Sequence, residues 1–365
     1  MTDSPAGLLT IDLGAMAANY RLLAQKAAPA EAAASVKADG YGLGLEPVVR
    51  TLARQGCRTY FVATIEEGFE LRGLLPDAGI CVLNGLIAGT PADFRAQRLM
   101  PVLNDLGQID AWRRWSGGTG PAPAALHLDT GMARLGLPPQ ELNVLANDPA
   151  LLDGVQLVLI MSHLACADAP GHPLNRQQLD AFAAALARLP AAPASLAASS
   201  GIFLGPEYHF DMVRPGACLH GVNPLPGQPN AMAPVVRLQA KILQIRDVDT
   251  PQTVGYGATH RCAGPSRVAT VAAGYADGYL RSLSGRGTAH FRDIPVPVVG
   301  RVSMDLITLD VTRAPEARPG DMVDLIGPHH DVDALAAEAG TIGYEILTGL
   351  GRRYRRRYVN GGDGA

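Results

Sequence analysis

Short apolar runs alternate with amphipathic stretches through the first two-thirds of the chain. Most runs are continuous rather than alternating, as expected of parallel strands covered on both faces. They predict strands near residues 33–37, 59–63, 80–84, 99–103, 124–129, 155–160, 193–198 and 212–221. Helical patterns separate them, among them residues 46–55, 65–75, 105–115, 139–147 and 174–189. This alternation is typical of a (β/α)8 barrel, which we favour. A doubly wound sheet is the main alternative, because periodicity alone does not show whether the sheet closes.

The pattern changes after a turn-rich segment at residues 223–227, which contains two prolines and a glycine. Beyond it the chain is rich in strand-like runs, at residues 235–248, 267–273, 297–311 and 321–326, and a helix is predicted near residues 332–339. We therefore predict an α/β protein with a (β/α)8 TIM barrel over residues 1–225. A C-terminal, mostly-β domain is predicted over residues 226–365.

The composition fits a globular chain with a sizeable core, since 47% of the 365 residues are hydrophobic and 18% are charged. A formal net charge of −3 gives no overall attraction to nucleic acid or to an anionic membrane. No run approaches the ~20 apolar residues that span a bilayer. Nucleic-acid and membrane partners are therefore not predicted. The basic run Arg352, Arg353, Arg355, Arg356 and Arg357 is interpreted as a solvated surface beyond the last helix.

Five scattered cysteines without a Cys-x-x-Cys pair indicate free thiols in a reducing compartment. The first residues lack the basic segment, apolar core and cleavage site of an export signal, so a cytoplasmic protein is expected. The run His329-His330-Asp331 is interpreted as a surface turn, because no second cluster of ligands accompanies it. No metal site is predicted.

Lys37 ends the first predicted strand. Barrel enzymes place their chemistry at the C-terminal ends of strands, so this lysine is expected at the mouth of the barrel. A partly desolvated lysine has a lowered pKa, which makes its amine available for a Schiff base. From its position alone, a surface lysine at a strand end is an equal alternative.

The segment Ser35-Val36-Lys37-Ala38-Asp39-Gly40-Tyr41-Gly42 closely resembles the pyridoxal-phosphate attachment segment of the alanine racemase family, in which a tyrosine follows the lysine by four residues. Further segments extend the resemblance across nearly the whole chain, and their order and spacing make it specific. They are Asp129-Thr130-Gly131-Met132-Ala133-Arg134-Leu135-Gly136, Ser162-His163-Leu164-Ala165, Asp211-Met212-Val213-Arg214-Pro215-Gly216, Val254-Gly255-Tyr256-Gly257, Gly274-Tyr275-Ala276-Asp277-Gly278-Tyr279, Gly300-Arg301-Val302-Ser303-Met304-Asp305 and Tyr344-Glu345.

The resemblance implies a barrel that carries pyridoxal 5'-phosphate, and a β domain. It also implies a head-to-tail homodimer in which each active site is built from both subunits. Racemisation removes the α-proton from one face and returns a proton to the other, so it needs acid/base groups on opposite sides. By resemblance, Lys37 serves one face, and Tyr256, reaching over from the other subunit, serves the opposite face. Without the family match, Tyr256 would be interpreted as an aromatic residue packed in a glycine-flanked turn.

The resemblance also places Arg214 opposite the pyridine nitrogen of the cofactor. A guanidinium can only donate there, which leaves that nitrogen unprotonated. A neutral ring is a weaker electron sink and disfavours transamination. A structural ion pair is the alternative use of Arg214. His163 is expected to bridge Tyr256 and Arg214, with a buried core histidine as the alternative.

The remaining expected roles concern the phosphate and the substrate. Arg134 is expected to contact the substrate carboxylate and the phenolic oxygen of the cofactor. Tyr41, Ser200, Tyr344 and the backbone at Gly216 and Ala217 are expected to hold the phosphate. Met304 and Asp305, contributed by the other subunit, are expected to border the substrate, while Tyr275 and Tyr344 narrow the entrance.

The sequence departs from the family pattern at several positions. Family members often have a lysine two residues before the Asp-Thr-Gly-Met run, where it orients the arginine, and here that position is His127. Only a neutral ring nitrogen could accept from Arg134, because a protonated ring would repel it. Ser199, Ser303 and the segment at residues 39–43 also differ from the residues that are common in the family.

The resemblance therefore implies a homodimeric racemase of small amino acids, which is expected to act on alanine and weakly on serine and to supply D-alanine for peptidoglycan. A broader amino-acid racemase of the same fold is one alternative, and an amino-acid decarboxylase on a related barrel is another. A third is a homologue that binds the cofactor without turnover.

Overall fold

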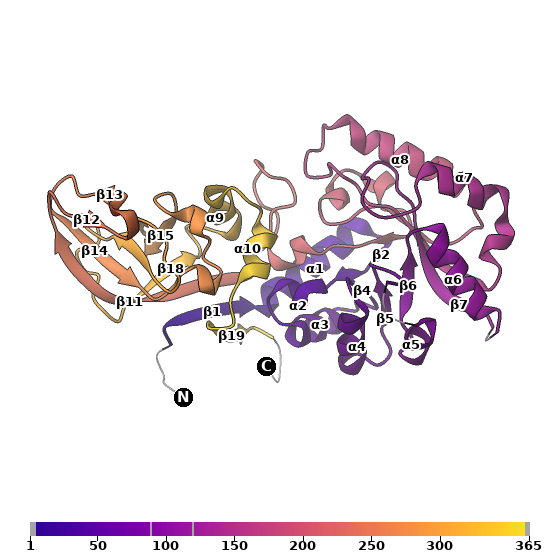
Figure 1. Ribbon diagram of the computed structural model, residues 1–365, viewed down its shortest axis with the longest axis horizontal. Helices are drawn as coiled ribbons and strands as arrows, with labels where there is room; N and C mark the ends of the chain where they lie inside the picture. The colour runs from indigo at the N-terminus through magenta and orange to yellow at the C-terminus, as the bar shows by residue number, and fades with distance from the viewer. Residues whose placement is uncertain (1–4, 88–89, 119, 362–365) are drawn as a thin grey trace. The chain divides into compact units, whose positions relative to one another are not determined.

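The computed structural model describes residues 5–87, 90–118 and 120–361 of the chain (Figure 1). These residues divide into two compact units. The barrel unit contains residues 16–219 and 223–232, and the β unit contains residues 5–15, 220–222 and 233–361. The predicted fold class, a (β/α)8 barrel followed by a mostly-β domain, is confirmed. The ranges 1–225 and 226–365 stay a prediction.

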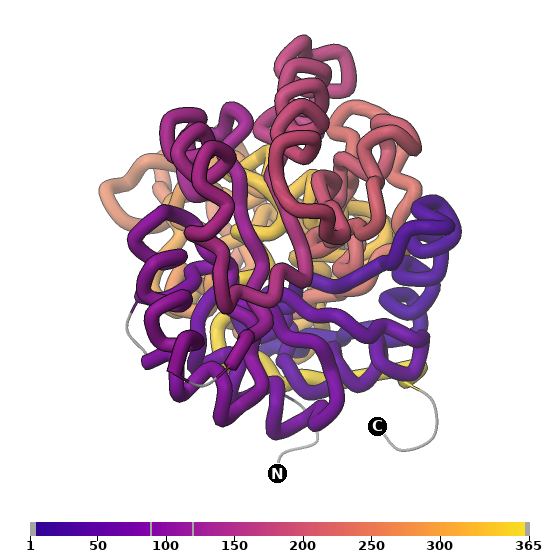
Figure 2. Tube along the Cα trace, turned by 90° about the vertical axis from the view of Figure 1, so that its right-hand side faces the viewer, coloured from indigo at the N-terminus to yellow at the C-terminus, as the bar shows by residue number. Residues whose placement is uncertain are grey.

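Parallel strands form the wall of the barrel unit in chain order. They are the first strand in two pieces, β2 (Glu31–Ala32) and β3 (Ala34–Ser35), then β4 (Thr59–Val62), β5 (Gly79–Val82), β6 (Met100–Leu103), β7 (Ala122–His127), β8 (Val155–Met161), β9 (Ala194–Ser195) and β10 (Met212–Val213). The ring closes because β10 pairs in parallel with β2, and the Ala33 amide donates to the Val213 carbonyl. In Figure 2 the colour passes around this unit from indigo to pink.

Helices alternate with these strands. They are α1 (Leu13–Ala27), α2 (Lys37–Tyr41), α3 (Leu45–Arg54), α4 (Ile65–Leu74), α5 (Pro91–Ala96), α6 (Leu106–Ser116), α7 (Pro139–Asn147) and α8 (Pro173–Leu186). Apolar side chains from successive strands form a buried cluster, as in a packed barrel core. These buried residues are Ala33, Phe61, Cys81, Val102, Ala125, Leu159 and Met161.

A mostly antiparallel sheet dominates the β unit, with the long strand β11 (Val236–Val248) at its centre. Its other strands are β1 (Gly7–Asp12), β14 (Ser266–Val271), β15 (Thr288–Phe291), β16 (Ile294–Pro297), β17 (Ile307–Asp310), β18 (Met322–Ile326) and β19 (Arg355–Val359). A hairpin of β12 (Thr253–Val254) and β13 (His260–Arg261) and the helices α9 (Val332–Ala339) and α10 (Gly343–Gly349) complete the unit. The helix α9 confirms the predicted helix near residues 332–339.

Two strands at the ends of the chain were not predicted. β1 pairs antiparallel with β11 and parallel with β19. The arginine run lies beyond the last helix and is mostly exposed, as interpreted from the sequence. Residues 355–357 belong to β19, and Arg353 forms ion pairs with Asp277 and Asp305.

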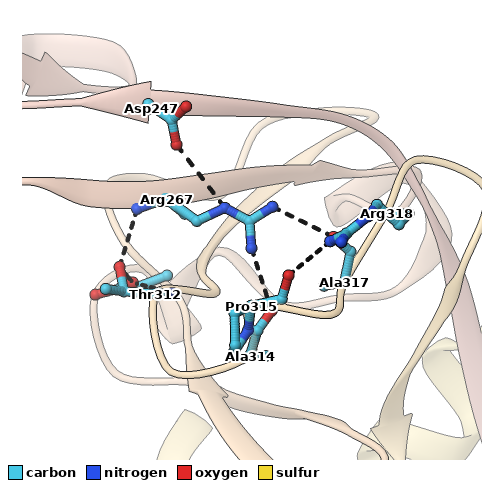
Figure 3. A network of polar contacts seen from close by, with 8 residues as sticks. Asp247, Arg267, Thr312, Ala314, Pro315, Ala317 and Arg318 are labelled. Carbon is cyan, nitrogen blue, oxygen red and sulfur yellow. Dashed lines mark hydrogen bonds and ion pairs between the residues drawn. The ribbon is translucent and has the colours of Figure 1, made fainter.

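A second arginine joins β14 to the loop that follows β17 (Figure 3). The Arg267 amide donates to Thr312 Oγ1 at 2.9 Å, and its guanidinium donates to the carbonyls of Ala314 and Ala317. Asp247, on β11, lies 3.8 Å from the same guanidinium. Arg267 therefore fixes this loop by hydrogen bonds to the backbone. Within the described residues, every helix is too short or too polar to cross a lipid bilayer.

Arg72, near the end of α4, holds two turns of the barrel unit together. Its side chain is buried, and its guanidinium donates to the carbonyls of residues 75, 76, 78, 97 and 98. These carbonyls would lose their partner in an apolar variant. An unpaired buried polar group costs about 1–3 kcal/mol, so the effect should be large.

We predict that Arg72→Leu lowers the free energy of unfolding of the barrel unit by about 2–4 kcal/mol. The matched control is Arg50→Leu, which removes an exposed ion pair with Glu46 and should change this free energy by less than about 1 kcal/mol. Urea titration followed by tryptophan fluorescence measures both, because Trp112 and Trp115 lie on α6 of this unit. Equal midpoints for the two variants would contradict the assignment.

Candidate active site

Lys37 directly follows the first barrel strand. The amide of Val36 donates to the Phe61 carbonyl of β4, so the wall of the barrel continues up to the lysine. The Lys37 side chain is half-buried, and burial, followed by repulsion from Arg134, lowers its pKa. A larger share of the amine is therefore neutral and nucleophilic near neutral pH.

The chain after Lys37 makes a left-handed turn. The φ angles of Ala38, Asp39, Gly40 and Tyr41 are 55°, 55°, 60° and 56°. Residues other than glycine disfavour this region by roughly 1–2 kcal/mol each. The turn ends at Gly42, whose amide donates to the Ala38 carbonyl at 2.7 Å. A strained conformation of this kind persists only where the surroundings hold it in place.

Glu67 is the residue that holds this turn. One carboxylate oxygen accepts from the Ala38 amide at 2.7 Å, and the other accepts from the Ala63 amide, also at 2.7 Å. The carboxylate therefore ties the Lys37 turn to the end of β4. Glu67 is not among the site residues predicted from the sequence. Its signal is the spacing of Thr64 and Glu67, which form a capping box at the start of α4.

The Tyr41 ring packs against the backbone of Gly216. A Cβ atom at Gly216 would lie 2.2 Å from Tyr41 Oη, so a larger residue at this position would displace the Tyr41 ring. The Gly216 amide donates to Ser199 Oγ at 3.0 Å. Ser200 begins the 3-10 helix η2 (Ser200–Phe203), and Ala217 begins η4 (Ala217–His220). The hydroxyl groups and backbone amides of these residues are of the kind that bind a phosphate ester.

Arg214 is a buried cation. Its guanidinium donates to the Ser162 carbonyl at 2.7 Å and to Ser195 Oγ. Burial lowers the pKa of Arg214 to about 10, so it stays charged near neutral pH. No carboxylate forms an ion pair with it among the described residues. The structure therefore does not support the alternative use of Arg214 in a structural ion pair.

His163 lies next to Arg214, with Nδ1 3.5 Å from the guanidinium. Burial, and then repulsion from Arg214 and Arg134, lowers the pKa of His163 to about 3. The ring is thus neutral near pH 7. Because a guanidinium can only donate, Nδ1 accepts, and the proton of the ring is on Nε2.

His127 forms a pair with Asn104. The Asn104 amide nitrogen donates to the carbonyls of Leu83 and Val102, so its oxygen is left to face His127 Nδ1 at 2.8 Å. This arrangement puts the ring proton on Nδ1 and a lone pair on Nε2. Burial lowers the pKa of His127 to about 4. The neutral ring therefore avoids the repulsion of Arg134 that a protonated histidine would cause.

Arg134 is exposed on a loop that folds back on β7. The Leu137 amide donates to the His127 carbonyl at 2.8 Å, and Asp129 Oδ1 accepts from the amides of residues 131–133. Asp129 thus shapes the loop, while the guanidinium stays accessible. Electrostatic interactions link Arg134 with Lys37, His127 and His163.

The other predicted site residues belong to the β unit. Tyr256 lies in the turn η5 (Tyr256–Ala258), and 70% of its surface is exposed, so it is not packed inside its own chain. Tyr275, Met304 and Tyr344 are exposed as well. Within the unit, Tyr275 lies close to the Met304 segment, because its amide donates to the Ser303 carbonyl at 3.0 Å. Asp305 accepts from Arg353.

Among the described residues, no group of three or more His, Cys, Asp and Glu side chains is arranged to bind a metal ion. His329 is exposed, as expected of a surface turn. His330 is buried instead, with Nε2 3.2 Å from a carboxylate oxygen of Glu338. The interpretation as a surface turn is therefore wrong for His330, because a carboxylate of α9 gives its ring a polar partner.

Comparisons with known proteins agree with this architecture. The family profile described as "Alanine racemase, N-terminal domain" matches residues 11–224, and "Alanine racemase, C-terminal domain" matches residues 235–358. A protein named "Alanine racemase" from Rhodospirillum rubrum is 54% identical over 98% of this chain and 96% of its own length. One named "Alanine racemase, catabolic" from Mesorhizobium japonicum is 49% identical over 99% of this chain and 96% of its own length.

A solved structure shows the same similarity in three dimensions. The crystal structure of alanine racemase from Bartonella henselae, with covalently bound pyridoxal phosphate, has a TM-score of 0.94 and 41% identity, and covers 97% of this chain and 99% of that one. This chain thus shares with that structure an architecture of a barrel unit followed by a β-rich unit. The chain belongs to the alanine racemase family.

We predict that the barrel unit loses stability as the pH falls from 6.5 to 4, with a contribution from His127. In the unfolded chain this ring takes up a proton near pH 6.5, whereas in the folded chain it does so only near pH 4. The folded state therefore binds fewer protons in this window and is destabilised by about 3 kcal/mol across it.

The variant His127→Gln should remove this part of the pH dependence while leaving that of His163. Urea titrations at several pH values, followed by tryptophan fluorescence, measure the slope. An identical slope in the variant and in the wild type would contradict the assignment of a neutral buried ring.

Proposed function

We propose that this chain interconverts L-alanine and D-alanine with pyridoxal 5'-phosphate as its cofactor, and so supplies D-alanine for peptidoglycan. The observation that carries this proposal is the half-buried Lys37 amine, with its lowered pKa, four residues before the Tyr41 ring that packs on Gly216. Membership of the family supports it, as does the pyridoxal phosphate bound in the Bartonella henselae protein.

The residues of the barrel unit fit this cofactor. Lys37 would hold it covalently, and Arg214 would donate to its ring nitrogen. Arg134 would contact its phenolic oxygen. The phosphate would be held by Tyr41, Ser200, Gly216 and Ala217 of this unit, and by Tyr344 of the β unit. When bound, pyridoxal phosphate withdraws electrons from the α-carbon of the substrate and makes the proton on that carbon acidic.

Two groups of the chain would move that proton. Lys37 is suited to act as the base on one face, because its lowered pKa leaves more neutral amine. Tyr256 would act on the opposite face. His163 would position Tyr256, since its Nε2 carries the ring proton while Nδ1 accepts from Arg214. Arg214 stays charged and donates only, so it would leave the ring nitrogen of the cofactor unprotonated.

Arg134 would bind the substrate carboxylate, since its guanidinium is exposed on a loop whose backbone Asp129 fixes. Tyr275, Tyr344, Met304 and Asp305 would border the substrate and restrict it to small side chains. The five free cysteines support the assignment to the cytoplasm.

We further propose a homodimer in which the β unit of one subunit completes the site of the other. Its support is the exposure of large apolar and aromatic side chains on the β unit, several of which are predicted site residues. These side chains are Tyr256, Tyr275, Met304, Leu306, Ile342 and Tyr344, between 37% and 70% exposed. Tyr256 lies between Gly255 and Gly257, whose positive φ angles let the turn project the ring outward.

We predict that the cofactor-loaded protein racemises L-alanine in deuterium oxide and incorporates α-deuterium. Lys37→Ala should abolish both, and Tyr256→Phe should lower the rate by at least about 100-fold, because each variant removes one acid/base group. Polarimetry and NMR measure the two signals. The control Lys26→Ala removes an exposed lysine that contacts the Phe203 ring and should keep full activity.

The lysine that binds the cofactor can be identified without measuring turnover. The chain has three lysines, Lys26, Lys37 and Lys241, so borohydride reduction followed by peptide mapping should label Lys37 alone. A labelled protein that neither exchanges nor racemises alanine would indicate a homologue without turnover. Racemisation of serine, lysine or arginine at similar rates would indicate the broader enzyme, and release of carbon dioxide would indicate a decarboxylase.

We predict that a heterodimer of Lys37→Ala and Tyr256→Phe subunits, isolated with two affinity tags, has about half of the wild-type activity, because one of its two shared sites is intact. The matched control pairs a wild-type subunit with a subunit that carries both substitutions, which leaves no intact shared site. The reverse result, activity only in the control, would place Lys37 and Tyr256 of the same chain in one site.

A further inference from the structure

Arg353 is the centre of an ion-pair cluster in the β unit. Its Nε and Nη2 atoms donate to the two carboxylate oxygens of Asp277 at 2.6 and 2.8 Å. Its Nη1 donates to Asp305 Oδ1 at 2.6 Å. The guanidinium therefore uses both of its edges, one on each carboxylate. The Asp277 carboxylate is only 7% exposed, so it depends on these bonds more than a surface carboxylate would.

The two carboxylates belong to segments that carry predicted substrate residues. Asp277 ends the turn η6 (Tyr275–Asp277), and its carboxylate also accepts from the Gly274 amide at 3.0 Å. Asp305 follows Met304. Backbone bonds join the segments, because the amides of Tyr275 and Ala276 donate to the carbonyls of residues 303 and 304. Arg353 thus holds both segments from one side.

The segment that carries Arg353 is itself fixed. The Gly351 amide donates to the Asp277 carbonyl at 2.9 Å. A Cβ atom at Gly278 would lie 2.1 Å from the Gly349 carbonyl oxygen, so the two backbones pack closely. The next residue, Tyr354, is 4% exposed and lies against Gly7 of β1. Arg353 therefore extends from a rigid base, whereas a long surface side chain would be free to reorient.

We propose that Arg353 is a positioning residue that fixes Tyr275 and the Met304–Asp305 pair as one wall of the substrate site, and so sets the affinity for alanine and its selection over larger amino acids. The inference rests on the proposed function, because it takes these three residues as the border of the substrate. Its two-sided ion pair also explains why an arginine is needed at this position, since an ammonium lacks the planar fork.

The test compares Arg353→Gln and Arg353→Lys with the control Arg352→Gln, an exposed neighbour that makes none of these bonds. Both Arg353 variants should raise the KM for alanine about tenfold, with kcat per bound cofactor within about twofold of the wild type. The ratio of kcat/KM for alanine to that for serine should fall. The control should retain all three values. A purely structural role would lower the fraction of loaded enzyme and leave KM unchanged.

Hydrogen exchange measured by mass spectrometry tests the positioning itself, without any substrate. The amides of residues 274–278 and 303–306 should exchange faster in both Arg353 variants and at the wild-type rate in the control. Unchanged exchange, or an unchanged KM in an active enzyme, would overturn the proposal. If the wild type did not racemise alanine, the proposed function would fail. Faster exchange at both segments would then support only the part of the proposal in which the Arg353 ion-pair cluster holds them in place.

Discussion

The left-handed turn after Lys37 is the constraint on which the site depends. Residues 38–41 occupy a backbone region that disfavours side chains, yet the turn is what brings Tyr41 back against Gly216. Glu67 stabilises it from outside by joining the Ala38 amide to the end of β4. The Glu67 carboxylate therefore links the end of β4 to the turn that carries the reactive amine and brings Tyr41 against Gly216.

Much of the barrel could be predicted because its strands are buried on both faces, which produces continuous apolar runs. The strand β1 shows the limit of that signal. Its alternating burial, with Leu9 and Ile11 inside, is that of a sheet with one covered face, and its partners β11 and β19 lie far away in sequence. The ion pairs of Arg353 could not be predicted for a related reason, because the acidic residues that pair with it lie in distant segments. Local charge patterns cannot reveal such partners.

For the predicted site, too, the sequence indicates some properties and not others. Lys37, Arg214 and His163 could be named from the motifs in which they occur. The protonation states of these residues could not be predicted, because they depend on burial and on neighbouring cations. Two cationic side chains, Arg134 and Arg214, and the Lys37 amine accompany two histidines, and burial and repulsion keep those rings neutral. An assembly of this kind favours anionic groups such as phosphates and carboxylates.

The strand β1 also has a consequence for the order in which the protein can fold. Because β1 lies between β11 and β19, the β sheet joins residues 7–12 to residues 236–248 and 355–359. During synthesis, β1 leaves the ribosome before the barrel, whereas β19 follows it. The sheet therefore stays open along β1 while the barrel forms, and its high contact order makes it the slower unit to complete. A fragment of the β unit that begins at residue 233 would lack β1, so residues 7–12 would have to be fused to it to complete the sheet.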